Sequence, residues 1–378
     1  MTDVVERVRR RLAGSGREAT PAVVAELVRV EAGGLTGEAE LLALVRQAQA
    51  ELVGAGPLEP LLRDPEVTDV LVNGPAEVWV DRGAGLCRVP VRFADDAAVR
   101  RLAQRLAVSA GRRLDGAQPW VDVPLSGGVR LHAVLAPIAA GGTCLSLRVL
   151  RPTAFSVPRL VELGTLTPVS ARLVTAVVSG RWSFLVSGGT GSGKTTLLAA
   201  LLGLASPTER VILVEDAPEL DPCHPHVVRL AARRPNVEGA GEVTLRDLVR
   251  QALRMRPDRL VLGEARGAEI ADLLGALNTG HEGGAGTVHA NSASEVPARL
   301  EALGALGGLG RAAVHSQLAA AVRLVLHLRR GGDGVRFVKE LSVLRRDGDW
   351  VRAVPAWRRD GAECPAAAEL AGMLRAPC

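Results

Sequence analysis

The sequence predicts an α/β protein: a larger strand-and-helix core, preceded by a smaller α+β domain and a short helical N-terminal segment. Three observations predict this. A glycine-rich loop lies between an apolar run and a helical stretch within residues 182–204. Apolar strands alternate with helical stretches from there to about residue 344. Within residues 56–150, short strands of alternating pattern are separated by Asn-Gly-Pro and Gly-Ala-Gly turns.

Residues 1–55 are expected to form three helices. Apolar side chains of the first helix, from Val4 to Leu12, share one face. Thr20 and Thr36 are favourable helix starts, and Gly54 is a favourable stop. We expect a helical cap that packs on the rest of the chain. The alternative is that the arginine-rich first helix lies on a membrane surface.

The remaining boundaries follow from changes in composition. We assign residues 56–151 to the α+β domain, 152–168 to a linker, 169–357 to the α/β core and 358–378 to a flexible tail. The strands expected in the α+β domain are 69–72, 77–81, 87–93, 128–135 and 143–150, with a helix at 95–111. The strands expected in the core are 182–186, 210–215, 259–263, 286–290, 322–328 and 335–344.

The glycine-rich loop matches the Walker A pattern GxxxxGK(S/T) in its required setting, between a strand and a helix. Its backbone N–H groups would face phosphates, Lys194 would reach the β and γ phosphates, and Thr195 would hold Mg²⁺. Lys194 is one of only two lysines in the chain, the other being Lys339. The core is therefore expected to be a RecA-like P-loop NTPase with ATP and Mg²⁺ as cofactors. The residues expected to bind the nucleotide are Gly188, Gly189, Thr190, Gly191, Ser192, Gly193, Lys194, Thr195 and Thr196.

Polar side chains follow the later core strands, at the sheet edge where open α/β sheets bind ligands. Glu215 and Asp216 end one strand, Glu264 ends the next in the position of a Walker B acid, and His289 ends a third. One acid beside a triphosphate can orient or deprotonate the attacking water, and another can bind Mg²⁺. Glu264 is our candidate for the metal, while either Glu215 or Glu264 could be the base.

Several of these segments together resemble the type II/IV secretion ATPases, most closely the TadA/CpaF branch that powers Flp-type pilus assembly. The resemblance covers about residues 54–345. It is carried by GPLEPLL, VNGP, GVRLHAVLAPIA, LSLRVLRP, the Walker A loop, EDAPEL, the Gly-Glu of Walker B and GHEGGAGTVHAN. Two departures are Glu282 in the last motif and Ala200 after the Walker A leucines, and neither removes a catalytic group.

The resemblance implies a homo-oligomer, a hexameric ring whose subunits bind ATP between their two domains. It makes Glu215 and Asp216 Asp-box residues, Glu264 the Walker B acid and His289 the His-box residue. It makes Arg130 and Arg148 charge-stabilising fingers, although from the sequence alone they could equally be ordinary surface arginines. It also implies an inner-membrane platform protein as partner, and a place at the cytoplasmic face of the membrane.

Composition narrows the class of protein. The 378 residues are 47% hydrophobic and 23% charged, with a net charge of +5, as expected of a globular protein. No apolar run reaches the roughly 18 residues that a membrane span needs, and no signal peptide is visible, so we expect a cytoplasmic protein. Five widely spaced cysteines predict free thiols. Cys223, His224 and His226 are expected to be exposed loop residues rather than metal ligands.

The leading hypothesis is an ATPase that drives assembly of a pilus or secretion of a protein. A DNA-pumping ATPase of a conjugation system is one alternative, although an aromatic content of 2% argues against direct nucleic-acid binding. A regulatory switch that binds nucleotide without hydrolysing it is the other, and Glu215, Glu264 and the two arginines argue against it.

Overall fold

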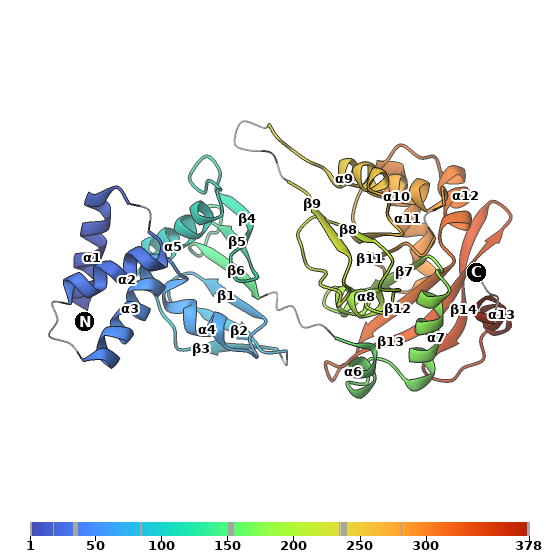
Figure 1. Ribbon diagram of the computed structural model, residues 1–378, viewed down its shortest axis with the longest axis horizontal. Coiled ribbons are helices and arrows are strands. Elements are labelled where there is room, and N and C mark those ends of the chain that lie inside the picture. The colour runs from blue at the N-terminus through green and yellow to red at the C-terminus, as the bar shows by residue number, and fades with distance from the viewer. Residues whose placement is uncertain are drawn as a thin grey trace. The chain divides into compact units, whose positions relative to one another are not determined.

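The computed structural model describes residues 2–17, 19–32, 37–83, 85–149, 155–233, 235, 240–280 and 282–375. The chain divides into two compact units, Met1–Arg151 and Pro152–Cys378, which are described separately (Figure 1). No helix among the described residues is long and apolar enough to cross a bilayer.

The first unit begins with three packed helices, as expected: α1 (Thr2–Ser15), α2 (Pro21–Glu31) and α3 (Glu38–Leu52). Thr20 caps α2 by accepting a hydrogen bond from the backbone N–H of Val23. The side chains of Val8 and Val28 are fully buried between the helices. The bundle therefore has an apolar core of its own.

The rest of the first unit is an antiparallel sheet with one long helix on it. The described strands follow the order β3-β2-β1-β6-β5-β4. Helix α5 (Asp96–Ser109) buries its apolar face on this sheet. The other elements are η1 (Gly56–Leu58), α4 (Glu59–Arg63), β1 (Asp69–Asn73), β2 (Val78–Asp81), β3 (Leu86–Val89), β4 (Trp120–Leu125), β5 (Val129–Val134) and β6 (Cys144–Val149). Strand β4 was not expected from the sequence; it holds Pro124, which an edge strand tolerates.

The second unit is a sheet covered by helices on both faces. Its described strands follow the order β14-β13-β12-β7-β11-β10-β8-β9, parallel from β12 to β9 and antiparallel at β13 and β14. The strands are β7 (Phe184–Gly188), β8 (Val211–Glu215), β9 (Val227–Ala231), β10 (Arg259–Ala265), β11 (Ala285–Val288), β12 (Leu324–Arg330), β13 (Arg336–Asp347) and β14 (Trp350–Arg358). Both outermost strands, β9 and β14, are additional to the strands expected from the sequence.

Two apolar layers hold the helices to this sheet. One lies under α6 (Val157–Glu162), α7 (Pro168–Ser179), α8 (Lys194–Leu202) and α13 (Ala367–Arg375). The other lies under α9 (Leu245–Ala252), α10 (Glu269–Leu277), α11 (Val296–Leu306) and α12 (Arg311–Ala321). Short helices η2 (Leu253–Met255) and η3 (Ala293–Glu295) complete the unit. Parallel strands with both faces covered have nearly continuous apolar sequences, and the central strands of this sheet follow that rule.

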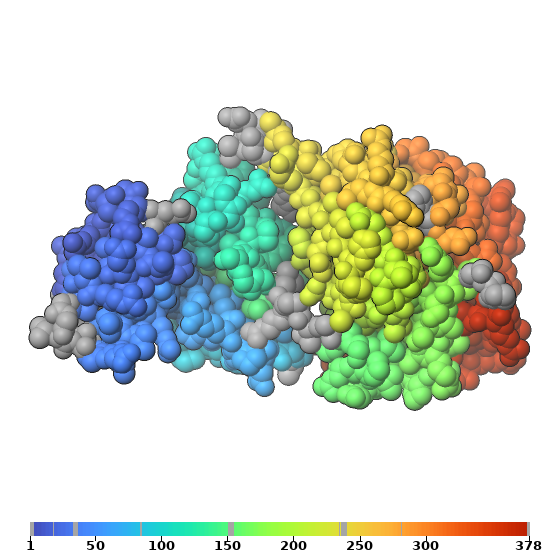
Figure 2. All heavy atoms as spheres, viewed as in Figure 1, coloured from blue at the N-terminus to red at the C-terminus, as the bar shows by residue number. Residues whose placement is uncertain are grey.

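Two expected boundaries differ from the structure. The segment expected as a linker contains α6, whose Val157 and Leu160 are buried in the apolar core of the second unit. The flexible tail predicted for residues 358–378 is wrong for its described part. Leu370 of α13 is buried in the same core, and Glu369 pairs with Arg345 of β13. The Ala- and Pro-rich sequence obscured the apolar face of α13, and Figure 2 shows the red C-terminal residues packed beside the green residues of α7.

Candidate nucleotide-binding site

The Walker A loop connects β7 to α8 in a backbone shape that requires glycine. Gly191 and Gly193 have φ angles of 68° and 92°, in the left-handed region. A Cβ on Gly188 would lie 2.6 Å from the Ser192 Oγ and 2.7 Å from the Leu328 carbonyl oxygen. Helix α8 begins without a side-chain cap, so its first N–H groups are free to bind an anion. The loop therefore fits a bound phosphate.

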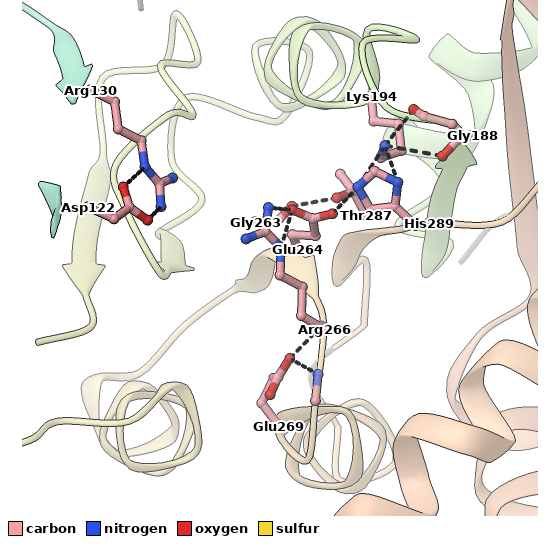
Figure 3. Close-up of polar contacts among 12 residues, drawn as sticks. Asp122, Arg130, Gly188, Lys194, Gly263, Glu264, Arg266, Glu269, Thr287 and His289 are labelled. Carbon is pink, nitrogen blue, oxygen red and sulfur yellow. Dashed lines mark hydrogen bonds and ion pairs between the residues drawn. The ribbon is translucent and has the colours of Figure 1, made fainter. Parts of the chain in front are cut away.

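Lys194 is folded back onto this loop. Its ammonium group donates to the carbonyl oxygens of Gly188 at 3.1 Å and Gly189 at 2.9 Å (Figure 3). It also lies 3.4 Å from each ring nitrogen of His289. Burial lowers the pKa of Lys194, and the charge of Glu264 opposes this effect. A phosphate in the loop would add further negative charge beside the buried ammonium.

The hydroxyl side chains of the loop differ in their contacts. The Ser192 Oγ donates to the Gly189 carbonyl oxygen at 2.9 Å and stabilises the turn. Thr195 and Thr196 lie half-buried in the first turn of α8. No hydrogen-bond partner of the Thr195 hydroxyl lies among the described residues. This hydroxyl is an oxygen ligand of the kind that Mg²⁺ prefers.

Glu264, His289 and Arg266 form a connected polar group. The Glu264 carboxylate contacts the His289 Nε2, and its other oxygen accepts from the Arg266 Nε at 2.6 Å (Figure 3). Glu269 accepts from the backbone N–H of Arg266 at 2.6 Å, which fixes the turn between β10 and α10. Burial, followed by the positive charge of Lys194, lowers the pKa of His289. The lowered pKa favours the neutral imidazole, which can accept a hydrogen bond from Lys194.

Glu215 occupies a tighter position at the end of β8. Its side chain is buried, and its Oε1 accepts from the backbone N–H groups of Glu219 at 3.0 Å and Leu220 at 2.9 Å. Burial raises the pKa of Glu215, and these two hydrogen bonds oppose the shift. The neighbouring residue on β10 is Gly263, where a Cβ would lie 2.7 Å from the Glu215 Cγ. The Thr287 hydroxyl of β11 donates to the Gly263 carbonyl oxygen at 2.7 Å.

Three candidate residues are not brought into this group by the contacts described. Asp216 is exposed and makes no hydrogen bond or ion pair with another described residue. Arg130 and Arg148 belong to the first unit. Arg130 donates twice to the carboxylate of Asp122, each at 2.8 Å, and the Arg148 Nε donates to Asp69 at 3.1 Å.

The sequence analysis missed Arg336, which touches the Walker A loop from β13. Its Nε donates to the Gly191 carbonyl oxygen at 2.8 Å, and its Cδ lies 3.3 Å from where a Gly193 Cβ would be. The two partners are 145 positions apart in the chain, so no local pattern indicates the contact. His327 of β12 is buried, and its Nδ1 lies 3.0 Å from the Ser187 Oγ, within hydrogen-bond distance.

The histidines that could suggest a metal site have other partners. The His224 Nε2 is 2.9 Å from the Ser206 carbonyl oxygen, and the His226 Nε2 is 2.9 Å from Arg210. Within the described ranges, no group of three or more His, Cys, Asp or Glu side chains could hold a metal ion. His281 lies outside those ranges.

Comparison with known proteins identifies a family that this chain matches over most of its length. The family model for the type II/IV secretion system protein matches residues 51–346. A putative conjugal transfer protein of Mycobacterium tuberculosis is 61% identical over 347 residues, covering 90% of this chain and 99% of the relative. The type IV secretion system protein PtlH of Bordetella pertussis is 32% identical over 339 residues, covering 82% and 95%.

Two solved structures support the fold alone. The pilus retraction motor PilT with bound ADP has a TM-score of 0.54 and 20% identity, covering 77% of this chain and 82% of its own. The ATPase DotB of Legionella pneumophila has a TM-score of 0.54 and 19% identity, covering 76% and 79%. The predicted α/β fold, with a RecA-like core after a smaller domain, is confirmed. Because the matched region spans most of the sequence, the chain belongs to the type II/IV secretion system protein family.

Proposed function

We propose that this chain is a motor that hydrolyses ATP to ADP and phosphate to drive pilus assembly or protein secretion through a Tad/Flp-like machine. The observation that carries the proposal is the convergence of three side chains from the start of α8, the end of β10 and the segment after β11. The Lys194 ammonium lies 3.4 Å from the His289 ring nitrogens, and His289 contacts Glu264. A cation, a neutral imidazole and a carboxylate at one phosphate loop suit phosphoryl transfer to water.

Each residue has a distinct role in this proposal. The loop from Gly188 to Gly193 and the first N–H groups of α8 hold the phosphates, and Lys194 exchanges its carbonyl partners for phosphate oxygens. Mg²⁺ would supply positive charge that offsets the charge of the phosphates. The Thr195 hydroxyl and the Glu264 carboxylate would hold it, directly or through water. His289 lies where it can contact the γ-phosphate.

We assign different roles to the two glutamates, Glu264 and Glu215. We assign Glu264 to orienting the attacking water, because its carboxylate faces Lys194 and His289. The two hydrogen bonds that Glu215 accepts from the backbone fix the segment that follows β8. The raised pKa of Glu215 disfavours the ionised carboxylate that a general base needs. Glu215 is therefore a positioning residue. Asp216, exposed at the same strand end, is assigned to contacts made only when nucleotide is bound.

Membership of the family supports a proposal for the assembly. We propose a hexameric ring at the cytoplasmic face of the membrane, working on an inner-membrane platform protein. Arg130 and Arg148 would reach the phosphates when ATP is bound and stabilise the charge that develops during transfer. They would do so by leaving Asp122 and Asp69.

A second candidate is a motor for conjugal DNA transfer. The name of the 61% identical Mycobacterium tuberculosis relative favours it. The two candidates differ in what stimulates turnover, since a DNA motor responds to DNA and a pilus or secretion motor responds to its membrane platform. Steady-state ATPase rates with and without single- and double-stranded DNA separate them.

The direct test is ATP hydrolysis by the purified protein beside Lys194→Ala and Glu264→Gln, with oligomeric state followed in the same samples. We expect Mg²⁺-dependent turnover that falls at least about 100-fold in both variants. Lys339→Ala is the matched control, because Lys339 is the other lysine and is exposed on β13. Tight ATP binding without turnover, even with the membrane platform added, would instead support a regulatory switch.

A further inference from the structure

A cleft of about 1030 Å³ lies within the first unit, and arginines dominate its polar lining. They come from the helical bundle (α1 and α3) and from the α+β fold (α4, α5 and the loop that follows β3), so the cleft lies between these two parts of the first unit. These residues are Arg9, Arg46, Arg63, Arg92, Arg101 and Arg105. The elements themselves are labelled in Figure 1.

The two carboxylates that line the cleft are already engaged. Glu59 accepts from Arg63 at 3.0 Å and from the backbone N–H of Ala55 at 2.8 Å. Glu51 accepts from Gln47 at 3.1 Å and pairs with Arg9 at 3.8 Å. Arg105 donates to the backbone carbonyl of Glu51 rather than to its carboxylate. The acidic side chains thus leave most of the positive charge uncompensated.

Three of the arginines have no counter-charge in the described part of the chain. Arg46, Arg92 and Arg101 are exposed and make no hydrogen bond or ion pair with another described residue. Arg101 stands one helical turn from Arg105 on α5, a spacing at which like charges repel. Burial, followed by the charge of Arg9, lowers the pKa of Arg105. An anion bound in the cleft would reduce the repulsion between these positive charges.

We propose that this cleft binds a phosphate-bearing ligand of about nucleotide size. Planar guanidinium groups match phosphate oxygens in pairs, which favours phosphate over a simple counter-ion. Ligand pockets of about 300–1,000 Å³ hold molecules of nucleotide size. The ring of Phe93 also lines the cleft and offers an apolar surface beside the charges. The ligand is either a soluble phosphate compound or the headgroup of an anionic lipid.

This site is separate from the Walker A loop. Every residue that lines the cleft belongs to the first unit, whereas the Walker A loop belongs to the second. Binding can therefore be measured with the Walker A loop disabled. A background substitution of Lys194→Ala removes the competing phosphate site and leaves the cleft unchanged.

The experiment compares two double variants on that background. Arg46→Glu with Arg101→Glu reverses two charges in the cleft. Arg29→Glu with Arg100→Glu makes the same change in net charge on α2 and α5, at arginines that do not line it. Inorganic tripolyphosphate, followed by calorimetry and thermal unfolding, is the soluble probe. Co-sedimentation with phosphatidylcholine vesicles, with and without phosphatidylglycerol, is the lipid arm.

We expect at least one probe to bind the Lys194→Ala protein, and the cleft variant to bind it at least about tenfold more weakly. The control variant should stay within about twofold. Tripolyphosphate binding indicates a soluble ligand, and binding only to phosphatidylglycerol vesicles indicates a lipid headgroup. Equal losses in both double variants, or no binding of either probe, would overturn the proposal. If circular dichroism shows that the cleft variant is unfolded, Arg46→Ala with Arg92→Ala replaces it.

Discussion

Arg148 of β6 lies directly opposite Arg130 of β5, and directly opposite Asp69 of β1 on its other side. Two like charges paired across strands repel, and the carboxylates of Asp122 and Asp69 offset that repulsion. Arg148 is the more exposed of the two, at 59% against 20% for Arg130. Each arginine thus has a carboxylate partner, which the proposed finger role would require it to leave.

Arg148→Ala is predicted to lower kcat by about 10³-fold with a smaller effect on KM, because a finger acts mainly in the transition state. Stability should change by less than about 1 kcal/mol, since the ion pair with Asp69 is solvent-exposed. Arg88→Ala, an exposed arginine on β3 of the same sheet, is the control. An unchanged kcat would remove Arg148 from the catalytic group.

Gly263→Ala is predicted to destabilise the second unit by about 1–3 kcal/mol, because the added Cβ meets the Glu215 Cγ. ATPase activity should fall as well, since Glu264 follows directly in the chain. Chemical denaturation measures the first effect and steady-state kinetics the second. Gly275→Ala in α10 is a matched control with no atom within 4 Å of its new Cβ, and it should be neutral or slightly stabilising.

Glu215→Gln is predicted to have a pH-dependent effect on stability. Burial raises the folded-state pKa of Glu215 above its ordinary value of 4.5, so the ionised form is disfavoured in the folded chain. The favourable contribution is complete below the ordinary pKa and is lost as the pH rises through the raised pKa. Glutamine keeps an oxygen for the two backbone hydrogen bonds and never ionises.

The melting temperature of the Gln variant should therefore match wild type near pH 4 and exceed it near pH 8. Thermal unfolding followed by circular dichroism across that range measures the difference. A wild-type protein more stable than the variant at pH 8 would mean that hydrogen bonds to the ionised carboxylate outweigh burial.

Arg336→Ala is predicted to raise KM for ATP about 3- to 10-fold, with little change in kcat. The substitution releases the Gly191 carbonyl oxygen, so the loop loses a contact that fixes its shape before phosphate binds. Arg346→Ala removes an arginine from the same strand whose Nε reaches only the Gly348 carbonyl oxygen, and it serves as control. A fall in kcat alone would place Arg336 in the transition state instead.

Much of the fold, and the residues of the candidate site, could be predicted from local sequence patterns. Lys194, Glu264 and His289 were found because each follows an apolar strand, and parallel strands end at one edge of a sheet. The same reasoning could not distinguish Glu215 from Glu264, because burial and backbone hydrogen bonds separate the two, and both depend on residues distant in the chain. Gly263 illustrates this, since its lack of a side chain matters only beside Glu215.

The elements and the contact that the sequence did not predict all depend on tertiary structure. Strands β4 and β9 lie at sheet edges, where half-exposed residues give a weak periodic signal. Helix α13 was hidden by a composition typical of loose ends, although its buried Leu370 anchors it. The Arg336 contact depends on how β13 pairs with β12, which no local pattern specifies.

The burial of the Lys194 ammonium should also lower its reactivity toward reagents that modify amines. An amine-directed acylating reagent has few targets here, namely the chain's two lysines and its amino terminus. Lys339 is exposed and would be modified quickly. Lys194 is only 7% exposed and donates hydrogen bonds to two loop carbonyl oxygens, so it would be modified more slowly. The ratio of the two modified peptides would then measure how strongly the loop shields Lys194, with Lys339 as an internal reference.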